Sequence, residues 1–124
     1  MLCAVQRLRQ LLTDQPSDVA LDVAALELAS IEFPGIDFET SLFRLDTFAD
    51  QIRTRITSGS SGLEFIEKVN ETLFDALQFR GNEGDYYDPR NSCLNAVLSR
   101  RLGIPISLSV VYIEIARRLG RPVY

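Results

Sequence analysis

The chain has 124 residues, of which 46% are hydrophobic and 24% are charged, a size and composition typical of one compact domain with its own core. It is mildly acidic, with a net charge of −4, and 12 of its 13 basic side chains are arginines scattered along the sequence. Because nucleic acids and anionic membranes are bound by a concentrated basic face, this distribution argues against either as the principal partner.

Helical spacing of apolar residues predicts three helices in the first half of the chain. The first spans about residues 2–12. Asp18 suits the cap of a second helix, residues 19–33, which is apolar over a wide arc and should lie deep in the fold, and Pro34 follows its end. The third helix, residues 37–56, is amphipathic. Its apolar side consists of Phe38, Leu42, Leu45, Ala49, Ile52 and Ile56.

A flexible connector, Thr57–Gly62, precedes a fourth predicted helix. Ser61 and Glu64 have the spacing of a capping box, in which the serine side chain accepts a hydrogen bond from the backbone N–H three residues later. The apolar face of this helix is predicted to contain Leu63, Ile66, Val69, Leu73 and Leu77.

Two further helices are predicted near the C-terminus. Asp88 followed by Pro89 suits the start of a fifth helix, and Gly103 ends it. Pro105 opens a sixth helix, Ile106 to Leu119, which has almost no polar side and is therefore expected to be the buried central helix. The fifth helix is expected to run through Leu94, Val97, Leu98 and Leu102.

The last residues, Arg121–Tyr124, have the pattern of a strand that enters a sheet. The sequence thus predicts a mostly α fold of five or six packed helices, a single helical domain over residues 1–124 that is an N-terminal fragment of a longer protein. An unpaired strand edge at this end would favour self-association.

Polar and charged side chains crowd the loop between the fourth and fifth helices, residues 79–91. They could pin the loop against the buried helix or bind a ligand. The adjacent Tyr86 and Tyr87 suit a peptide or protein surface, with one of the two expected to pack inward. Asp85 and Asp88 have no further converging ligands, so a capping or solvated role is favoured over a metal site. The candidate binding residues are Arg80, Asn82, Asp85, Tyr86, Tyr87, Asp88, Arg90 and Asn91.

Several segments carry a family resemblance. They are Phe79-Arg-Gly-Asn-Glu-Gly-Asp-Tyr-Tyr-Asp-Pro-Arg-Asn-Ser92, Leu94-Asn95, Arg100-Arg101, Gly103-Ile-Pro-Ile-Ser-Leu-Ser109 and Ala116-Arg-Arg-Leu-Gly120. Together they resemble the SirB-type transglutaminase-like domain family, closely over residues 79–120 and more loosely before them. The resemblance implies the helical part of a transglutaminase-like, papain-like α+β domain, in which a buried helix is followed by a sheet.

The resemblance also implies which residues a catalytic member of the family would need. In the broader class a cysteine opens the buried helix, and the following strands supply histidine and aspartate. Here that helix opens with Ile104-Pro-Ile-Ser107, and the chain contains no histidine. The SirB-type family typically continues into a Pro-Gly-His-Phe segment, and this chain ends before such a segment.

Cys93 and Ser107 are the two catalytic candidates. Cys93 lies near the start of the fifth helix, where the helix dipole would lower the pKa of its thiol, but a buried packing role is the favoured alternative. Ser107 lies close to the position of the nucleophile in the related enzymes, but capping of the sixth helix explains it more simply. No metal site, disulfide or cofactor is predicted, because Cys3 and Cys93 are far apart and histidine is absent.

Three functions remain open at this point. The leading hypothesis is a non-catalytic domain of a cytoplasmic protein that acts as a protein-interaction or regulatory module and contacts a protein or peptide through residues 79–91. The alternative is a thiol hydrolase or transferase on peptide amides, with Cys93 as nucleophile and a histidine supplied after Tyr124. A third reading is a structural cap for downstream repeats.

Overall fold

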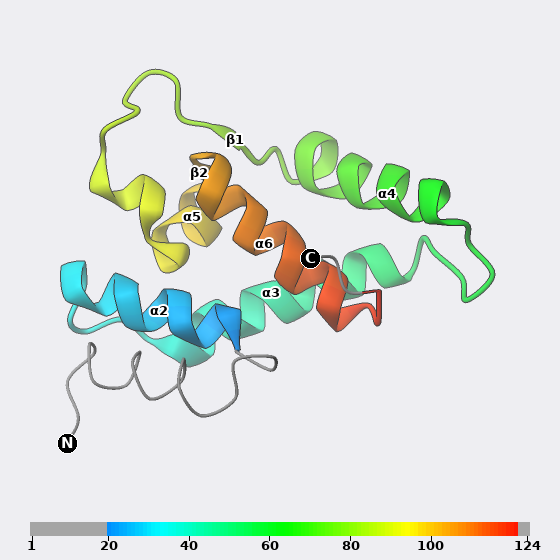
Figure 1. The fold of residues 1–124 in the computed structure, drawn as a ribbon, viewed down its shortest axis with the longest axis horizontal. Helices are drawn as coiled ribbons and strands as arrows, with labels where there is room; N and C mark the ends of the chain where they lie inside the picture. Colours follow the sequence, from blue (N-terminus) through cyan, green and yellow to red (C-terminus); the bar gives the residue numbers. More distant parts are fainter. Residues whose placement is uncertain (1–19, 122–124) are drawn as a thin grey trace.

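The computed structural model describes residues 20–121 and is mostly helical, which confirms the predicted fold class (Figure 1). Three predicted features lie outside the described residues. They are the first helix, the Asp18 cap of the second helix, and the expected C-terminal strand apart from Arg121. The helices are α2 (Leu21–Glu32), α3 (Phe38–Arg53), α4 (Gly62–Asn70), the π-helical turn η2 (Glu71–Ala76), the 3₁₀ turn η3 (Pro89–Ser92), α5 (Leu94–Arg100) and α6 (Pro105–Arg118). Two short strands complete the order, β1 (Arg80–Gly81) and β2 (Leu102–Gly103).

Helix α6 lies at the centre, where it contacts α2, α3 and α5 (Figure 1). Its inward side carries Val111, Ile115 and Ala116, which are fully buried. Each large aliphatic side chain buried in this way contributes about 1.5–3 kcal/mol to folding. The core cluster around them includes Leu26, Leu45, Phe48, Ile52, Phe65, Val69, Leu73, Phe79, Leu94, Val97 and Leu98.

Burial of α6 and α2 is more one-sided than their apolar sequences predict. At the start of α6, Ile106 is 77% exposed. On α2, Leu28 and Ile31 are exposed, whereas the charged Asp22 and Glu27 are buried. The expectation that α2 lies deep over a wide apolar arc was therefore wrong in detail, because part of that arc faces outward and two acidic side chains face inward.

Side-chain caps begin both α3 and α4, and the cap predicted at Ser61 is confirmed. The Asp37 carboxylate accepts a hydrogen bond from the backbone N–H of Glu39 at 3.0 Å and so caps α3, which ends at Arg53 rather than at residue 56. At α4, Ser61 Oγ accepts a hydrogen bond from the Glu64 N–H at 3.1 Å. Each cap satisfies an N–H group that the first helical turn leaves without a partner.

The buried stripe of α4 and η2 differs from the predicted one. It is formed by Phe65, Val69, Leu73 and Leu77, whereas Leu63 and Ile66 are exposed. Residues four apart drift around an α-helix by about 40° per step, because each residue advances by about 100°. The wider π-helical turn counteracts that drift, so the four side chains stay on one side.

The predicted fifth helix is divided into two pieces. Asp88 caps the short η3 turn, Cys93 is extended, and α5 begins only at Leu94. Arg101 then takes a left-handed conformation, with φ of 60°, and ends the helix. The prediction that Leu102 belongs to the fifth helix was therefore wrong, because the helix ends before it and Leu102 lies in strand β2.

Strands β1 and β2 pair in parallel, with Arg80 opposite Leu102 and Gly81 opposite Gly103. Glycine is required at position 103 by close packing, since a Cβ atom there would lie 2.7 Å from Ser107 Oγ. This small sheet therefore fixes the beginning of the polar loop beside the first turn of α6.

Candidate functional site

Asn91 organises the polar loop from a buried position. Only 1% of this residue is exposed, and its Nδ2 donates to the backbone oxygens of Asp85 at 2.8 Å and Tyr86 at 2.9 Å. Its Oδ1 accepts a hydrogen bond from Asn82 Nδ2 at 3.0 Å. Asn82 Oδ1 in turn accepts from the Asp85 N–H at 3.1 Å. The two asparagines therefore fix the turn that carries the tyrosines.

Ser107 joins this loop to α6. Its hydroxyl donates to the backbone oxygen of Asn91 at 2.6 Å, and its Oγ accepts from the Ile104 N–H at 3.0 Å. The second contact satisfies one of the N–H groups at the helix start. The structure thus places Ser107, a catalytic candidate in the sequence, between the loop and the beginning of α6.

Asp88 forms the second fixed point of the loop. Its carboxylate accepts hydrogen bonds from the Arg90 side chain, with Nη2 at 2.6 Å and Nε at 3.0 Å, and Arg100 Nη2 lies 3.6 Å away. The Arg90 side-chain hydrogen bonds, helped by the Arg90 backbone N–H, hold the pKa of Asp88 at about 2. The carboxylate is therefore charged at neutral pH and acts as cap and ion-pair partner at the same time.

The two tyrosines and Arg80 remain available at the surface. Tyr86 is 55% and Tyr87 is 91% exposed, and their rings meet edge to face with centroids 5.3 Å apart. The expectation that one of them packs inward was wrong, because the turn held by Asn91 projects both from the domain. The Arg80 side chain is also exposed and makes no hydrogen bond or ion pair with residues 20–121.

Cys93 lies just before α5 in a buried position, with its thiol 3.5 Å from the backbone oxygen of Pro89. Burial raises the pKa of the Cys93 thiol, and the nearby charges of Glu32 and Asp88 raise it further. An activated nucleophile needs the opposite shift, toward the thiolate at neutral pH. This environment is that of a packed, protonated thiol.

We therefore expect Cys93 to react slowly with iodoacetamide. In a Cys3→Ser background, the alkylation rate should stay below that of a small free thiol throughout the neutral range. The rate should rise only as the pH passes the ordinary thiol pKa of about 8.5, because only then does thiolate form. The same measurement in urea provides the control, since unfolding should bring the rate to the free-thiol value. A rate that is already high and constant below pH 7 would contradict this expectation.

An apolar pocket of about 360 Å³ lies between α2 and the first turns of α6. It meets the polar loop at Ser92, the residue after Asn91, so the two features are continuous. The exposed side chains of Leu28 and Ile106 belong to its wall. The remaining residues that line it are Leu21, Ala24, Ala25, Leu94, Ile104, Ser107 and Val110.

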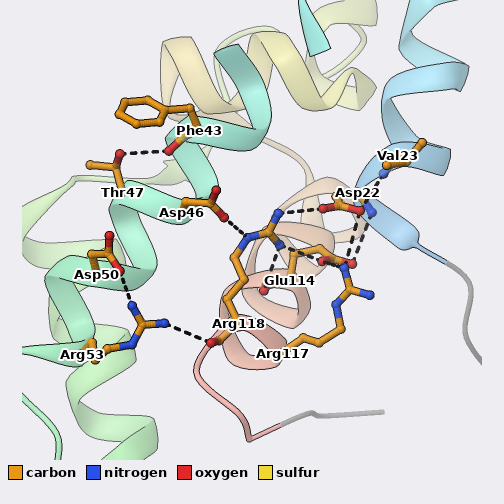
Figure 2. Close-up of polar contacts among 10 residues, drawn as sticks. All are labelled: Asp22, Val23, Phe43, Asp46, Thr47, Asp50, Arg53, Glu114, Arg117 and Arg118. Carbon is orange, nitrogen blue, oxygen red and sulfur yellow. Dashed lines mark hydrogen bonds and ion pairs between the residues drawn. The ribbon is translucent and has the colours of Figure 1, made fainter. Parts of the chain in front are cut away.

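A second polar cluster, which local sequence patterns did not predict, links α2, α3 and α6 (Figure 2). Arg118 contacts Asp22 Oδ2 and Asp46 Oδ1, each at 2.7 Å, and Glu114 Oε2 at 2.9 Å. Arg117 reaches the same Glu114 oxygen at 2.6 Å. A lone glutamate within the otherwise apolar stretch of α6 was the signal in the sequence, because a buried charge requires a partner.

Residues 20–121 contain neither a cluster of metal ligands nor a membrane-spanning helix. No group of three or more potential ligands among His, Cys, Asp and Glu is placed to hold a metal ion there. Nor does that part of the chain contain a helix whose length and apolar character would allow it to cross a membrane.

Comparison with known proteins gives matches to one family and to several relatives. The model of the transglutaminase-like superfamily matches residues 39–124. A UPF0162 protein of Xylella fastidiosa (strain Temecula1) is 41% identical over 98 residues, which are 79% of this chain and 35% of that protein. F-box only protein 21 of Mus musculus is 46% identical over 59 residues, 48% of this chain and 9% of that protein. This chain thus spans about a third of the length of the Xylella relative, and no solved structure matches it.

Proposed function

The chain belongs to the transglutaminase-like superfamily, and from this premise we propose that it is a non-catalytic, SirB-type domain that acts as a protein-interaction or regulatory module. Its contact surface is the loop of residues 79–91, and its partner is a protein or a peptide. The cytoplasmic location expected from the sequence is part of the same proposal.

The observation that carries this proposal is the exposed pair Tyr86 and Tyr87 on a loop that is already fixed. Tyrosine is enriched at protein interfaces, because its ring provides contact area and its hydroxyl a hydrogen bond. Asn91 and the Asp88–Arg90 pair hold the loop in place. A partner therefore binds a loop that is already ordered, so little conformational entropy of the loop is lost on binding.

The lengths of the relatives support a modular role. The segment shared with the Xylella protein makes up 35% of that protein, whereas the segment shared with mouse F-box only protein 21 makes up 9%. Related sequence thus occurs within chains of very different total length. Such reuse is expected of a module that is combined with other parts.

The surroundings of the two catalytic candidates do not support an enzymatic function. The first turn of α6 carries Ser107, whose hydroxyl is hydrogen-bonded to the backbone of Asn91 and Ile104, and no cysteine. Cys93 is buried and its thiol has a raised pKa. The SirB-type assignment rests on the motif segments of residues 79–120, which include the loop and this helix start.

The interaction surface is tested by a pull-down with the purified protein as bait and lysate of the source cells as prey. We expect the double variant Tyr86→Ala, Tyr87→Ala to bind its partner at least about tenfold more weakly, because tyrosines at an interface often each contribute 2 kcal/mol or more. Titration of the captured partner against each bait gives the affinities. Thermal melting should be unchanged, since both side chains are exposed.

Phe43→Ala is the matched control. Phe43 is another exposed aromatic residue, but it lies on α3 and outside the loop. Loss of binding in both variants would indicate non-specific adhesion to aromatic surface. Equal binding by the double variant and the wild type would show that the loop is not the contact surface.

A further inference from the structure

A small polar pocket lies where the two short strands begin. Its volume is about 140 Å³, and it is lined by Leu77, Gln78, Arg80, Arg100 and Arg101. Three of these five residues are arginines from two separate segments, although the chain as a whole is acidic. Among the described residues that line it there is no carboxylate, so this lining concentrates positive charge.

The hydrogen-bonding capacity of these arginines is only partly used. Arg101 Nη1 donates to the backbone oxygen of Leu77 at 3.1 Å, and its guanidinium lies over the Phe48 ring, 5.8 Å from the centroid. Arg100 approaches Asp88 through Nη2 at 3.6 Å, whereas its Nη1 is buried and has no acceptor among the described residues. The Arg80 side chain makes neither a hydrogen bond nor an ion pair within residues 20–121.

Helix ends explain Arg101 but not the other two. The pocket lies beside the C-terminal ends of η2 and α5, where unpaired carbonyl groups attract cations. Arg101 satisfies one such carbonyl, that of Leu77. Arg100 Nη1 and the whole Arg80 guanidinium remain without a partner among the described residues. For the buried Arg100 Nη1 this is unfavourable, because a buried N–H group needs an acceptor.

The backbone at this pocket is also unusual. Gln78 and Arg101 both have φ of 60°, and they are the only residues other than glycine with positive φ in the described part of the chain. Both line the pocket. Strained backbone of this kind persists where the surrounding structure holds it and is common at binding sites.

From the unsatisfied guanidinium groups, the absence of carboxylates in the lining and the strained backbone, we infer that this pocket binds one oxyanion group, a phosphate or a carboxylate. Arginine recognises both through paired, charge-assisted hydrogen bonds. A volume of about 140 Å³ accommodates a few water-sized groups of about 30 Å³ each, whereas pockets for whole small molecules occupy about 300–1,000 Å³. The site shares Arg80 with the proposed contact loop, whereas Arg100 and Arg101 lie outside that loop. The inference does not rest on the tyrosines, so the failure of one proposal would leave the other standing.

The test is a titration with inorganic phosphate and, separately, with acetate, at constant ionic strength maintained with sodium chloride. Chemical-shift changes of the amide and arginine side-chain NMR signals show which residues lie near the bound anion. We expect saturable shifts at residues 78–81 and 100–103. Arg80→Gln should weaken the affinity about tenfold or more, since charge-assisted hydrogen bonds are lost. This variant should fold normally, because the exposed side chain has no partner within residues 20–121.

Arg44→Gln is the matched control, since it removes one positive charge from an exposed position on α3. Its affinity should remain within about twofold of the wild type. Binding of phosphate alone would assign the site to a phosphorylated ligand, and binding of both probes would extend it to carboxylates. The inference is overturned if neither probe gives saturable shifts at the pocket, or if Arg80→Gln and Arg44→Gln bind equally well.

Discussion

Replacement of Arg118 by methionine should lower the free energy of unfolding by about 3–5 kcal/mol, because it leaves buried carboxylates without their main partner. Glu114 is 1% exposed, and the Asp22 side chain is also buried. Both contact the Arg118 guanidinium, at 2.9 and 2.7 Å (Figure 2). Arg117 still lies 2.6 Å from Glu114 and 3.5 Å from Asp22, but its side chain is more exposed than that of Arg118, so it compensates only in part.

The position of Arg118 explains the size of this effect. Burial favours the neutral form and would by itself lower the pKa of Arg118, but the hydrogen bonds to Asp22 and Asp46 outweigh it and raise the pKa. Glu114 also accepts a hydrogen bond from the Asp22 backbone N–H at 3.2 Å, so the cluster connects α2 to α6. Since a whole domain is stable by only about 5–15 kcal/mol, the loss would be a large share of its stability.

Urea unfolding followed by circular dichroism measures the change. Arg44→Met is the control, because Arg44 is an exposed arginine on α3, and its replacement should cost at most about 0.5 kcal/mol. A second substitution, Glu114→Gln, introduced into Arg118→Met should restore part of the lost stability by removing one buried charge. A loss below about 1 kcal/mol for Arg118→Met would mean that these carboxylates are not buried as described.

The sequence predicted the helices well where the signals were local. Ser61 caps the helix that its spacing with Glu64 indicated, and Pro105 opens α6. The Arg118 cluster could not be found in that way, because Asp22 and Asp46 lie 96 and 72 positions away along the chain. Local context alone would assign Arg117 and Arg118 as cations near a helix C-terminus, which is only part of their role.

The candidate site shows the same division between local and tertiary information. The polar loop was recognisable from its composition, and the link between Asn82 and Asn91 spans only nine positions. The exposure of Ile106 and of both tyrosines depends on how the loop and α6 pack, which periodicity does not report. Arg101 and its left-handed turn were missed because the sequence there reads as continuous helix.

Asn91→Ala should give the second largest effect, a loss of about 2–3 kcal/mol of stability together with loss of order in the loop. The substitution removes three side-chain hydrogen bonds, to Asn82 and to the backbone of Asp85 and Tyr86. Each buried group left without a partner costs about 1–3 kcal/mol, but the loop carbonyls can turn toward water and reduce the total. Protection of the amide of Asp85, whose acceptor is Asn82, should fall most in hydrogen exchange.

Asn91→Ala also tests whether binding by the tyrosines requires the fixed conformation of the loop. Tyr86 and Tyr87 remain in the sequence of Asn91→Ala, so weaker partner binding would show that the fixed conformation of the loop contributes to affinity. Asn70→Ala, an exposed asparagine at the end of α4, should change neither stability nor binding appreciably. If Asn91→Ala lost loop protection but bound the partner with wild-type affinity, the tyrosines would not require a preformed loop, and the argument from preorganisation would fail.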